Sequence, residues 1–166
     1  MPQLKPCCLG YRELLRQEFK VIDNPSLTTY ILEIKKDEDA AVCIGALGKI
    51  PFKKGTYFYI GSAKKNLYSR IKRHIKREKK LFWHIDYLLN QKDCYINNIW
   101  FTDTEECKAA QLFSSIVVSR PIEKFGCSDC RCRTHLFYVR DNNEIGGILS
   151  QIGCITKLPG SLFAVL

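Results

Sequence analysis

The sequence predicts an α/β domain in which a small, mainly antiparallel sheet of three to five strands is flanked by helices. Runs rich in β-branched and aromatic residues, typical of strands, precede a basic segment whose apolar residues recur every fourth position, as on one face of a helix. With 166 residues and a hydrophobic fraction of 46%, the chain is long enough for one well-buried core and too short for two ordinary domains. We therefore expect a single domain.

Three strands are expected ahead of the basic segment. They occupy residues 26–34 (SLTTYILEI), 41–47 (AVCIGAL) and 55–61 (GTYFYIG). The polar run at 35–40 predicts a turn between the first two strands, and the Gly and Pro residues of 48–55 predict a loop before the third.

Further helices and strands are expected after the basic segment. Residues 81–90 (LFWHIDYLLN) and 103–117 (DTEECKAAQLFSSIV) predict helices, and residues 94–102 (CYINNIWFT) predict a strand. A cysteine-dense loop within residues 125–140 leads into another strand.

The predicted domain covers residues 26–140. Residues 1–25 are interpreted as an N-terminal extension with a helix over 10–20, and the turn-rich residues 141–166 as a tail packed on the same domain. No stretch is apolar and long enough to span a bilayer, and the N-terminus carries charges where a signal peptide needs an apolar run. We therefore expect a cytoplasmic protein without a membrane partner.

Positive charge is concentrated on one short segment. Between residues 64 and 80 there are nine Lys or Arg residues and one acid, Glu78, so this segment carries +8 of a whole-chain net charge of +9. A basic element of this density favours nucleic acid as partner, then an acidic membrane surface, over a merely solvated helix face. The candidate nucleic-acid contacts are Ser62, Lys64, Lys65, Lys72, Arg73, Lys76 and Arg77.

The helix predicted in this segment has a buried stripe formed by Leu67, Ile71 and Ile75. Arg70 and His74 are four residues apart on its flank, so their side chains point the same way. The helix is therefore expected to border a cleft and also to contact a polymer backbone.

Several motifs occur in a fixed order along the chain. Tyr30 on the first strand is followed by YIGSA at 59–63, then by Arg70 and His74, and later by WHIDYL, a Glu-Cys pair and GCSDCxCxxHL. This set resembles the GIY-YIG nuclease superfamily, and within it the Uri-type endonuclease domain, over roughly residues 26–140. The chain departs from the family pattern at the first motif, where Thr28 and Thr29 stand in place of Gly and Ile.

The resemblance implies a hydrolase, an endonuclease that cleaves a nucleic-acid phosphodiester, DNA favoured, with Mg²⁺ or Mn²⁺. Glu106 matches the single metal-binding carboxylate, which suits Mg²⁺ held by one hard ligand and waters, whereas Glu105 is expected only to favour the helix start. Arg70 matches the catalytic arginine, whose always-charged fork can bind the scissile phosphate as negative charge develops.

Tyr30 and Tyr59 match the tyrosines of the family's GIY and YIG motifs. One of them is expected to orient or deprotonate the attacking water, with Tyr30 favoured and the reverse order open. Because a free phenol has a pKa of about 10, this role needs nearby positive charge. His74 is expected to hydrogen-bond the phosphate or a tyrosine hydroxyl, and Gly61 to give a phosphate access to the backbone.

The cysteine-dense loop contains four plausible soft ligands. Cys127, Cys130, Cys132 and His135 form CxxCxCxxH, which predicts a structural zinc site, with reduced thiols or disulfides as the alternatives. His84 is interpreted as either a structural residue or a contributor to the cleft.

Two classes of function remain open from the sequence. One is the nuclease in which Tyr30, Tyr59, Arg70 and Glu106 converge on one phosphate. The other is a nucleic-acid-binding module that keeps the scaffold and has lost turnover. A module that docks on membranes or proteins is disfavoured because the basic helix lacks a wide apolar face. Basic charge carries no base code, so DNA or RNA, strand preference and oligomeric state stay open.

Overall fold

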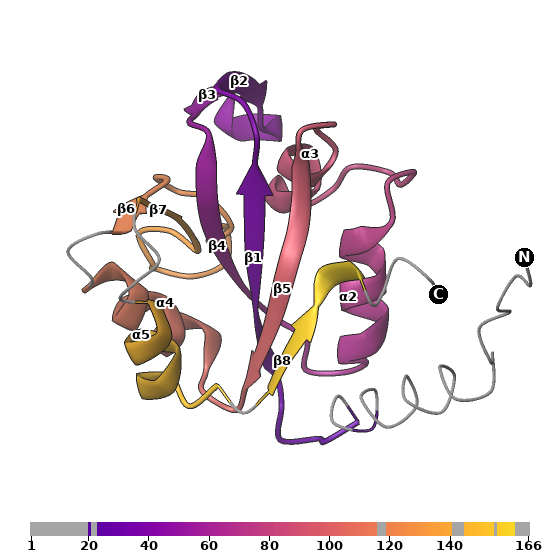
Figure 1. The fold of residues 1–166 in the computed structure, drawn as a ribbon, viewed down its shortest axis with the longest axis vertical. Coiled ribbons are helices and arrows are strands. Elements are labelled where there is room, and N and C mark those ends of the chain that lie inside the picture. The colour runs from indigo at the N-terminus through magenta and orange to yellow at the C-terminus, as the bar shows by residue number, and fades with distance from the viewer. Residues whose placement is uncertain (1–19, 21–22, 116–118, 141–144, 155, 162–166) are drawn as a thin grey trace, which may run out of the picture.

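A six-stranded sheet forms the centre of the molecule (Figure 1). The computed structural model describes residues 20, 23–115, 119–140, 145–154 and 156–161. In these residues the strand order is β6-β7-β4-β1-β5-β8, and every neighbouring pair is antiparallel. Four α-helices with described bounds, α2 to α5, and a separate two-stranded hairpin complete the described part of the fold. The predicted α/β class with an antiparallel sheet is confirmed, and the predicted number of strands is too low.

The three long strands lie side by side in the middle of the sheet. β1 (Thr29–Lys36) pairs with β4 (Gly55–Ser62) on one side and with β5 (Cys94–Thr102) on the other. Because both faces of β1 and β4 are covered, nearly every residue in them is buried. The strands predicted over 26–34, 55–61 and 94–102 correspond to these three elements.

The outer strands are short. β7 (Leu136–Val139) pairs with β4, β6 (Ser119–Pro121) pairs with β7, and β8 (Thr156–Pro159) extends the sheet beyond β5. Neither β6 nor β8 was predicted, because strands of three or four residues are too short to show a clear alternation. The residues interpreted as a tail thus supply one edge of the sheet.

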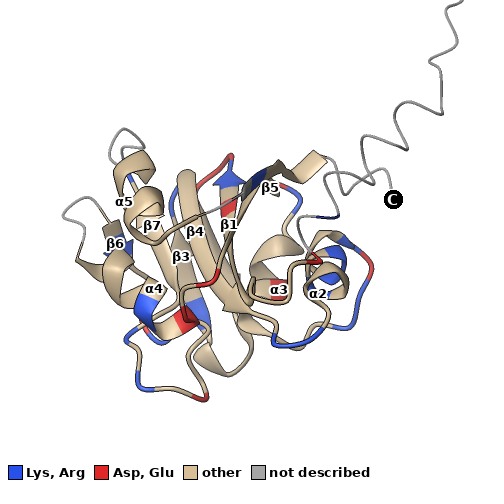
Figure 2. Ribbon diagram, turned by 90° about the horizontal axis from the view of Figure 1, so that it is seen from below, with Lys and Arg blue, Asp and Glu red and all other residues tan. Residues whose placement is uncertain are grey.

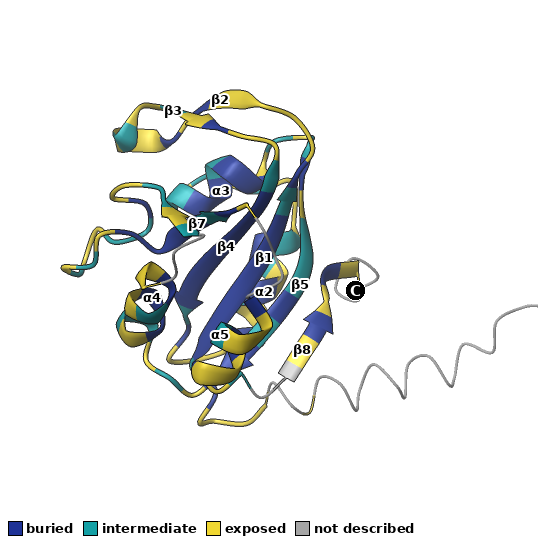
Figure 3. Cartoon of the chain, turned by 60° about the vertical axis from the view of Figure 1, so that its left-hand side comes forward, coloured by how far each residue is buried: buried dark blue, intermediate teal, exposed yellow. Residues whose placement is uncertain are grey.

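The hairpin consists of β2 (Ala40–Cys43) and β3 (Lys49–Phe52), joined through a 3₁₀ turn, η1 (Gly45–Leu47). The strand predicted over 41–47 therefore ends early, and the loop predicted at 48–55 contains a strand. Figure 3 shows that most of this hairpin is exposed, in contrast to the buried central strands.

Helices cover both faces of the sheet. α2 (Leu67–Ile75) and α3 (His84–Leu89) lie on one face, and α4 (Glu106–Ser114) and α5 (Ile145–Gln151) lie on the other (Figure 2). Alternate residues of β4 accordingly enter two cores, with Tyr57 and Tyr59 in the first and Phe58 and Ile60 in the second.

The basic helix is shorter than its charge pattern suggested. α2 begins after Asn66, whose side chain accepts a hydrogen bond from the Ser69 N–H, and its last helical residue is Ile75. The Lys79 ammonium then donates to the carbonyls of Arg73 and His74, which satisfies the end of the helix. Residues 76–83, between α2 and α3, form neither helix nor strand.

The buried face of α2 also differs from the prediction. Leu67, Ile71 and His74 are buried, whereas Ile75 is only half-buried. The predicted stripe was correct for two of its three positions, and a histidine takes the third. In the described part of the chain, no helix has the length and apolar character that crossing a membrane requires. The predicted helix at 10–20 lies, apart from Lys20, outside that part.

Candidate functional site

A pocket opens at one end of the sheet, where β4 ends, β1 begins and β5 leads into α4. It encloses about 440 Å³. Its lining residues are Thr28, Thr29, Ser62, Lys64, Asp103, Glu105, Glu106, Cys107, Gly126, Asp129, Cys130 and His135. The pocket thus joins the first basic residue after β4 to the acidic start of α4 and to the cysteine-dense loop.

Glu106 is the first residue of α4, where the helix dipole favours a carboxylate. Its Oε2 accepts a hydrogen bond from the Ser62 hydroxyl, and its Oε1 lies 2.9 Å from Nδ1 of His135. The His135 contact is close in distance but lies outside good hydrogen-bond alignment. Burial alone would raise the pKa of Glu106, but His135, Ser62 and then Arg70 lower it overall, so the group is an anion at neutral pH.

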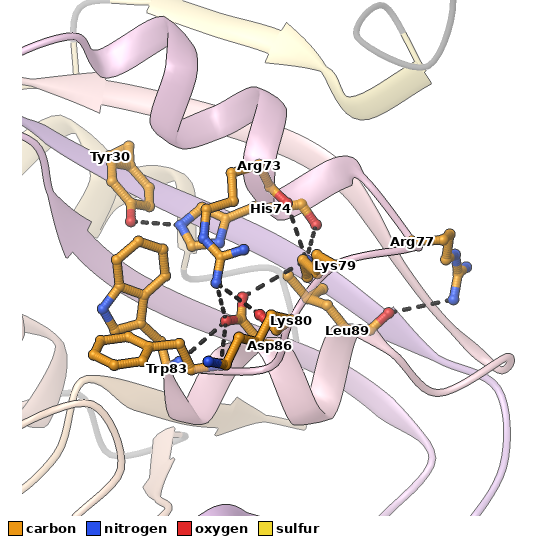
Figure 4. A network of polar contacts seen from close by, with 10 residues as sticks. Tyr30, Arg73, His74, Arg77, Lys79, Lys80, Trp83, Asp86 and Leu89 are labelled. Carbon is orange, nitrogen blue, oxygen red and sulfur yellow. Dashed lines mark hydrogen bonds and ion pairs between the residues drawn. The ribbon is translucent and has the colours of Figure 1, made fainter.

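Tyr30 is joined to His74 under the buried face of α2. The Tyr30 hydroxyl and the His74 Nε2 form a 2.7 Å hydrogen bond, and both side chains are 2% exposed (Figure 4). Burial, and then the charges of Lys79, Arg70 and Arg73, lower the pKa of His74 to about 3. His74 is therefore a neutral imidazole at neutral pH. The sequence predicted a phosphate or a tyrosine hydroxyl as its hydrogen-bond partner, and in the structure the partner is the Tyr30 hydroxyl.

The charge state of the two tyrosines differs from the expectation. Burial is the largest influence and raises the pKa of both Tyr30 and Tyr59, while the charge of Arg70 lowers it by less. Glu106 raises both values further. Positive charge therefore does not outweigh burial here, and both side chains are protonated phenols at neutral pH.

Gly61 has a different role from the one predicted. It pairs with Tyr30 inside the sheet, and a Cβ at this position would lie 2.8 Å from Cε2 of the Tyr30 ring and closer still to its hydroxyl end. Glycine is therefore needed here to make room for the tyrosine that bonds His74, rather than to give a phosphate access to the backbone.

Arg70 and Arg73 both stack on Trp83 but are otherwise unlike. Their guanidinium carbons lie 4.2 and 4.4 Å from the Trp83 ring centre. Arg73 also donates to Oδ2 of Asp86 at 2.6 Å (Figure 4). The guanidinium of Arg70 makes no hydrogen bond or ion pair with any other described residue, so its donors are available to a ligand.

Some cations of the basic segment serve the fold. The Arg77 guanidinium donates to the carbonyls of Leu89, Gln91 and Cys94. Arg73 and Arg77, both predicted as nucleic-acid contacts, thus bind protein groups in the structure. Among the predicted contacts, the exposed lysines without an acidic partner in the described residues are Lys64, Lys65, Lys72 and Lys76.

The predicted zinc site needs a correction in its ligand set. The ligand atoms of Cys107, Cys130, Cys132 and His135 all lie within 4.8 Å of one another, and this cluster could hold a metal ion such as zinc. Cys127 is not part of it, because its Sγ faces the Arg133 carbonyl at 3.7 Å.

Sequence spacing could not place Cys107 in this cluster, because it lies far from the other three ligands along the chain. The Glu-Cys pair noted among the motifs was the one signal for it. His84 has a structural contact, since its Nδ1 accepts the Gly126 N–H at 3.1 Å, and burial lowers its pKa.

Comparisons with known proteins give one match. No curated protein and no solved structure matches the chain significantly. The motifs suggested the GIY-YIG superfamily and its Uri-type domain. The family comparison does not give that family, so the assignment was wrong. Residues 29–155 instead match the model of the family described as "Domain of unknown function DUF123". Because this match spans most of the sequence, the chain belongs to the DUF123 family.

Proposed function

We propose that the protein binds nucleic acid, DNA favoured, and hydrolyses a phosphodiester bond with a divalent cation at Glu106. One observation carries the proposal. Arg70 on α2 and Glu106 on α4 come from opposite faces of the sheet, and both change the pKa of the same two tyrosines, Tyr30 and Tyr59. A cation, an anion and two phenols therefore lie within electrostatic reach of one another beside a pocket.

The proposed roles follow from the state of each group. Arg70, with its donors unused by the protein, binds the phosphoryl oxygens as negative charge builds up on them. The protonated phenol of Tyr30 or Tyr59 holds the attacking water by a hydrogen bond. Neutral His74 positions the Tyr30 hydroxyl through their 2.7 Å hydrogen bond.

Glu106 fits a hard divalent cation. It is anionic and faces the pocket, and each of its oxygens has one contact in the protein, which leaves a lone pair for a ligand. Asp103 lines the same pocket and adds negative charge. Mg²⁺ or Mn²⁺ bound there would stabilise charge on the phosphoryl oxygens and lower the pKa of a bound water.

The surface around the pocket suits a polyanion. Lys64 lines the pocket and Lys65 follows it, while Lys72 and Lys76 extend the positive charge along α2. Phe82, at 73% exposure, lies just after this segment and offers a ring on which an unpaired base can stack. Affinity should therefore fall steeply as salt concentration rises.

A second function, binding without turnover, is favoured by a specific observation. Tyr30 and Tyr59 are only 2% and 8% exposed, and both oxygens of Glu106 are already in contact with protein groups. On this alternative the pocket is a phosphate-binding site, and the polymer is held but not cut.

Cleavage of a panel of labelled DNA and RNA, single-stranded, duplex and branched, with Mg²⁺, Mn²⁺ or EDTA distinguishes the two functions. Glu106→Gln keeps one acceptor oxygen, for either Ser62 or His135, and removes the charge, so we expect metal-dependent cleavage to fall about 100-fold or more. Glu105→Gln is the matched control and should retain most activity.

Binding measured on the same variants completes the test. Salt-sensitive binding should persist in both variants, because neither substitution removes a lysine or an arginine. Binding by the wild-type protein without cleavage of any substrate would establish the alternative and refute the nuclease.

A further inference from the structure

The cluster of Cys107, Cys130, Cys132 and His135 has the dimensions of a tetrahedral metal site. With Zn–S near 2.3 Å and Zn–N near 2.0 Å, a tetrahedral ion separates two of its sulfurs by about 3.8 Å and a sulfur from a nitrogen by about 3.5 Å. Sγ of Cys130 and Nε2 of His135 lie 3.5 Å apart, and no two ligand atoms are farther apart than 4.8 Å. The site would need little rearrangement to close around an ion.

The ligand types select the metal. Three thiols and one imidazole are soft and borderline ligands that suit zinc, whereas Mg²⁺ and Mn²⁺ prefer oxygen. The sulfurs of the three cysteines also interact with one another, so they gather at one point rather than facing separate surroundings. Four protein ligands leave no open position on a tetrahedral ion, which is typical of a structural site.

The local fold gives such an ion a structural purpose. Residues 122–135 connect β6 to β7 without a helix or a strand, and Gly126 within them has a φ of 74°. Cys130, Cys132 and His135 come from this connection, while Cys107 comes from the first turn of α4. One ion would therefore join the connection to the helix that carries Glu106.

His135 links the cluster to Glu106. Its Nε2 faces the sulfur of Cys130, and its Nδ1 lies 2.9 Å from Oε1 of Glu106. A metal-bound histidine usually directs its other ring nitrogen at a carboxylate, which fixes the tautomer and orientation of the ring. Glu106 occupies that position.

We propose that Cys107, Cys130, Cys132 and His135 bind a structural Zn²⁺ ion, and that Glu106 orients the His135 ligand. Binding releases the thiol protons to solvent and needs no oxidant or reductant. The proposal does not depend on hydrolysis, because a protein that binds nucleic acid without cutting it would hold the same ion.

The first experiment measures metal content directly. Protein purified from zinc-supplemented medium should contain about one zinc ion per chain, measured by inductively coupled plasma mass spectrometry. Cys107→Ser and Cys132→Ser should each lose most of this zinc. Cys127→Ser is the matched control and should keep it, because Cys127 is in the same loop but outside the cluster.

A second experiment uses the wild-type chain, in case the variants fail to fold. Alkylation of the zinc-loaded protein, mapped by mass spectrometry of peptides, should modify Cys43 and Cys127 and spare the three cluster cysteines until a chelator is added. Replacement of zinc by Co²⁺ should give the absorption bands of a tetrahedral ion with thiolate ligands.

A third experiment tests the role of Glu106. Glu106→Ala should weaken zinc affinity about 10- to 100-fold in competition with a chelator, whereas Glu106→Gln, which keeps an acceptor oxygen, should stay near the wild type.

Several outcomes would overturn the proposal. These are a chain that binds no zinc, a disulfide among the cluster cysteines, or loss of zinc from Cys127→Ser but not from Cys107→Ser. Equal zinc affinity in Glu106→Ala and wild type would remove the role of Glu106. None of these readouts measures cleavage, so they stand apart from the cleavage test.

Discussion

Two carboxylates, the buried Asp86 and the half-buried Glu106, show the difference between a closed and an open polar site. Asp86 is 0% exposed, and its Oδ2 accepts hydrogen bonds from the Arg73 guanidinium and from two backbone N–H groups, while Lys79 lies 3.7 Å from its Oδ1. The Glu106 side chain is 25% exposed at a pocket, and its polar contacts within the described residues are with Ser62 and His135.

The comparison separates two uses of the same chemistry. The charge of Asp86 is closed to solvent and lies among cations and donors that the protein itself supplies, so it holds α2 and α3 together. Glu106 faces a pocket and keeps capacity for a ligand, and the guanidinium donors of Arg70 are unused by the described residues. We infer that burial and partner supply together separate a charge that stabilises the fold from one that can bind a ligand.

Removal of Asp86 should have the largest effect on stability. Asp86→Ala leaves Arg73 and Lys79 without their shared partner, so we expect a loss of about 3–5 kcal/mol in the free energy of unfolding. Urea denaturation at neutral pH measures it, with exposed Asp129→Ala as the control, expected within about 0.5 kcal/mol of wild type. Similar values for both variants would show that the Asp86 network is not structural.

The neutral His74 beside this network should make the fold sensitive to acid. Its pKa is about 3 in the folded protein and about 6.5 in the unfolded chain, so between these values only the unfolded state binds the proton. Stability is therefore lost as pH falls below 6.5, by about 2–3 kcal/mol over the next two pH units.

The measurement is a series of denaturant titrations across that pH range. His74→Gln should flatten the decrease, whereas His84→Gln should leave most of it, because His84 is less buried. Equal pH dependence in His74→Gln and wild type would contradict the assignment.

Gly61 tests whether the position of Tyr30 matters to the open site. Gly61→Ala places a methyl group against the Tyr30 ring, so we expect a loss of about 1–3 kcal/mol and a displaced tyrosine. Gly147→Ala is the control, because its added methyl meets open space in α5 and should change stability by about 1 kcal/mol or less. Chemical denaturation and near-ultraviolet circular dichroism would measure the two effects, and an unchanged Gly61→Ala protein would refute the steric argument.

The smallest effects should separate the cations of the basic segment. Arg77→Ala removes donors from three backbone carbonyls, so we expect about 1–2 kcal/mol lower stability. Lys76→Ala should leave stability within about 0.5 kcal/mol but reduce the slope of log affinity against log salt by about one. Chemical denaturation of both variants measures stability, and fluorescence anisotropy with labelled DNA measures affinity. Equal stabilities of the two variants would contradict the prediction.

Sequence patterns found the long strands and missed three of the short ones. β1, β4 and β5 are long enough for their residues to show strand character, and each was predicted near its observed bounds. β3, β6 and β8 have three or four residues each and owe their existence to a neighbouring strand, which local patterns do not reveal.

The candidate site divides in the same way. Residue types and order selected Tyr30, Arg70, His74 and Glu106, and the structure joins Tyr30 to His74 and places Glu106 at the pocket. They did not indicate that both tyrosines stay protonated, because desolvation depends on everything packed around a side chain. They also suggested the wrong family, because shared short motifs do not establish membership.

The sequence by itself determined the α/β class, the central antiparallel strands and the concentration of positive charge on one segment. Composition and periodicity are local properties, and they suffice for these features. Only the tertiary structure decided that Cys107 rather than Cys127 joins the cysteine cluster, and that Arg73 is paired while Arg70 is not. The physical reason is that metal geometry, burial and charge pairing depend on distances in space, which chain folding sets between residues far apart in sequence.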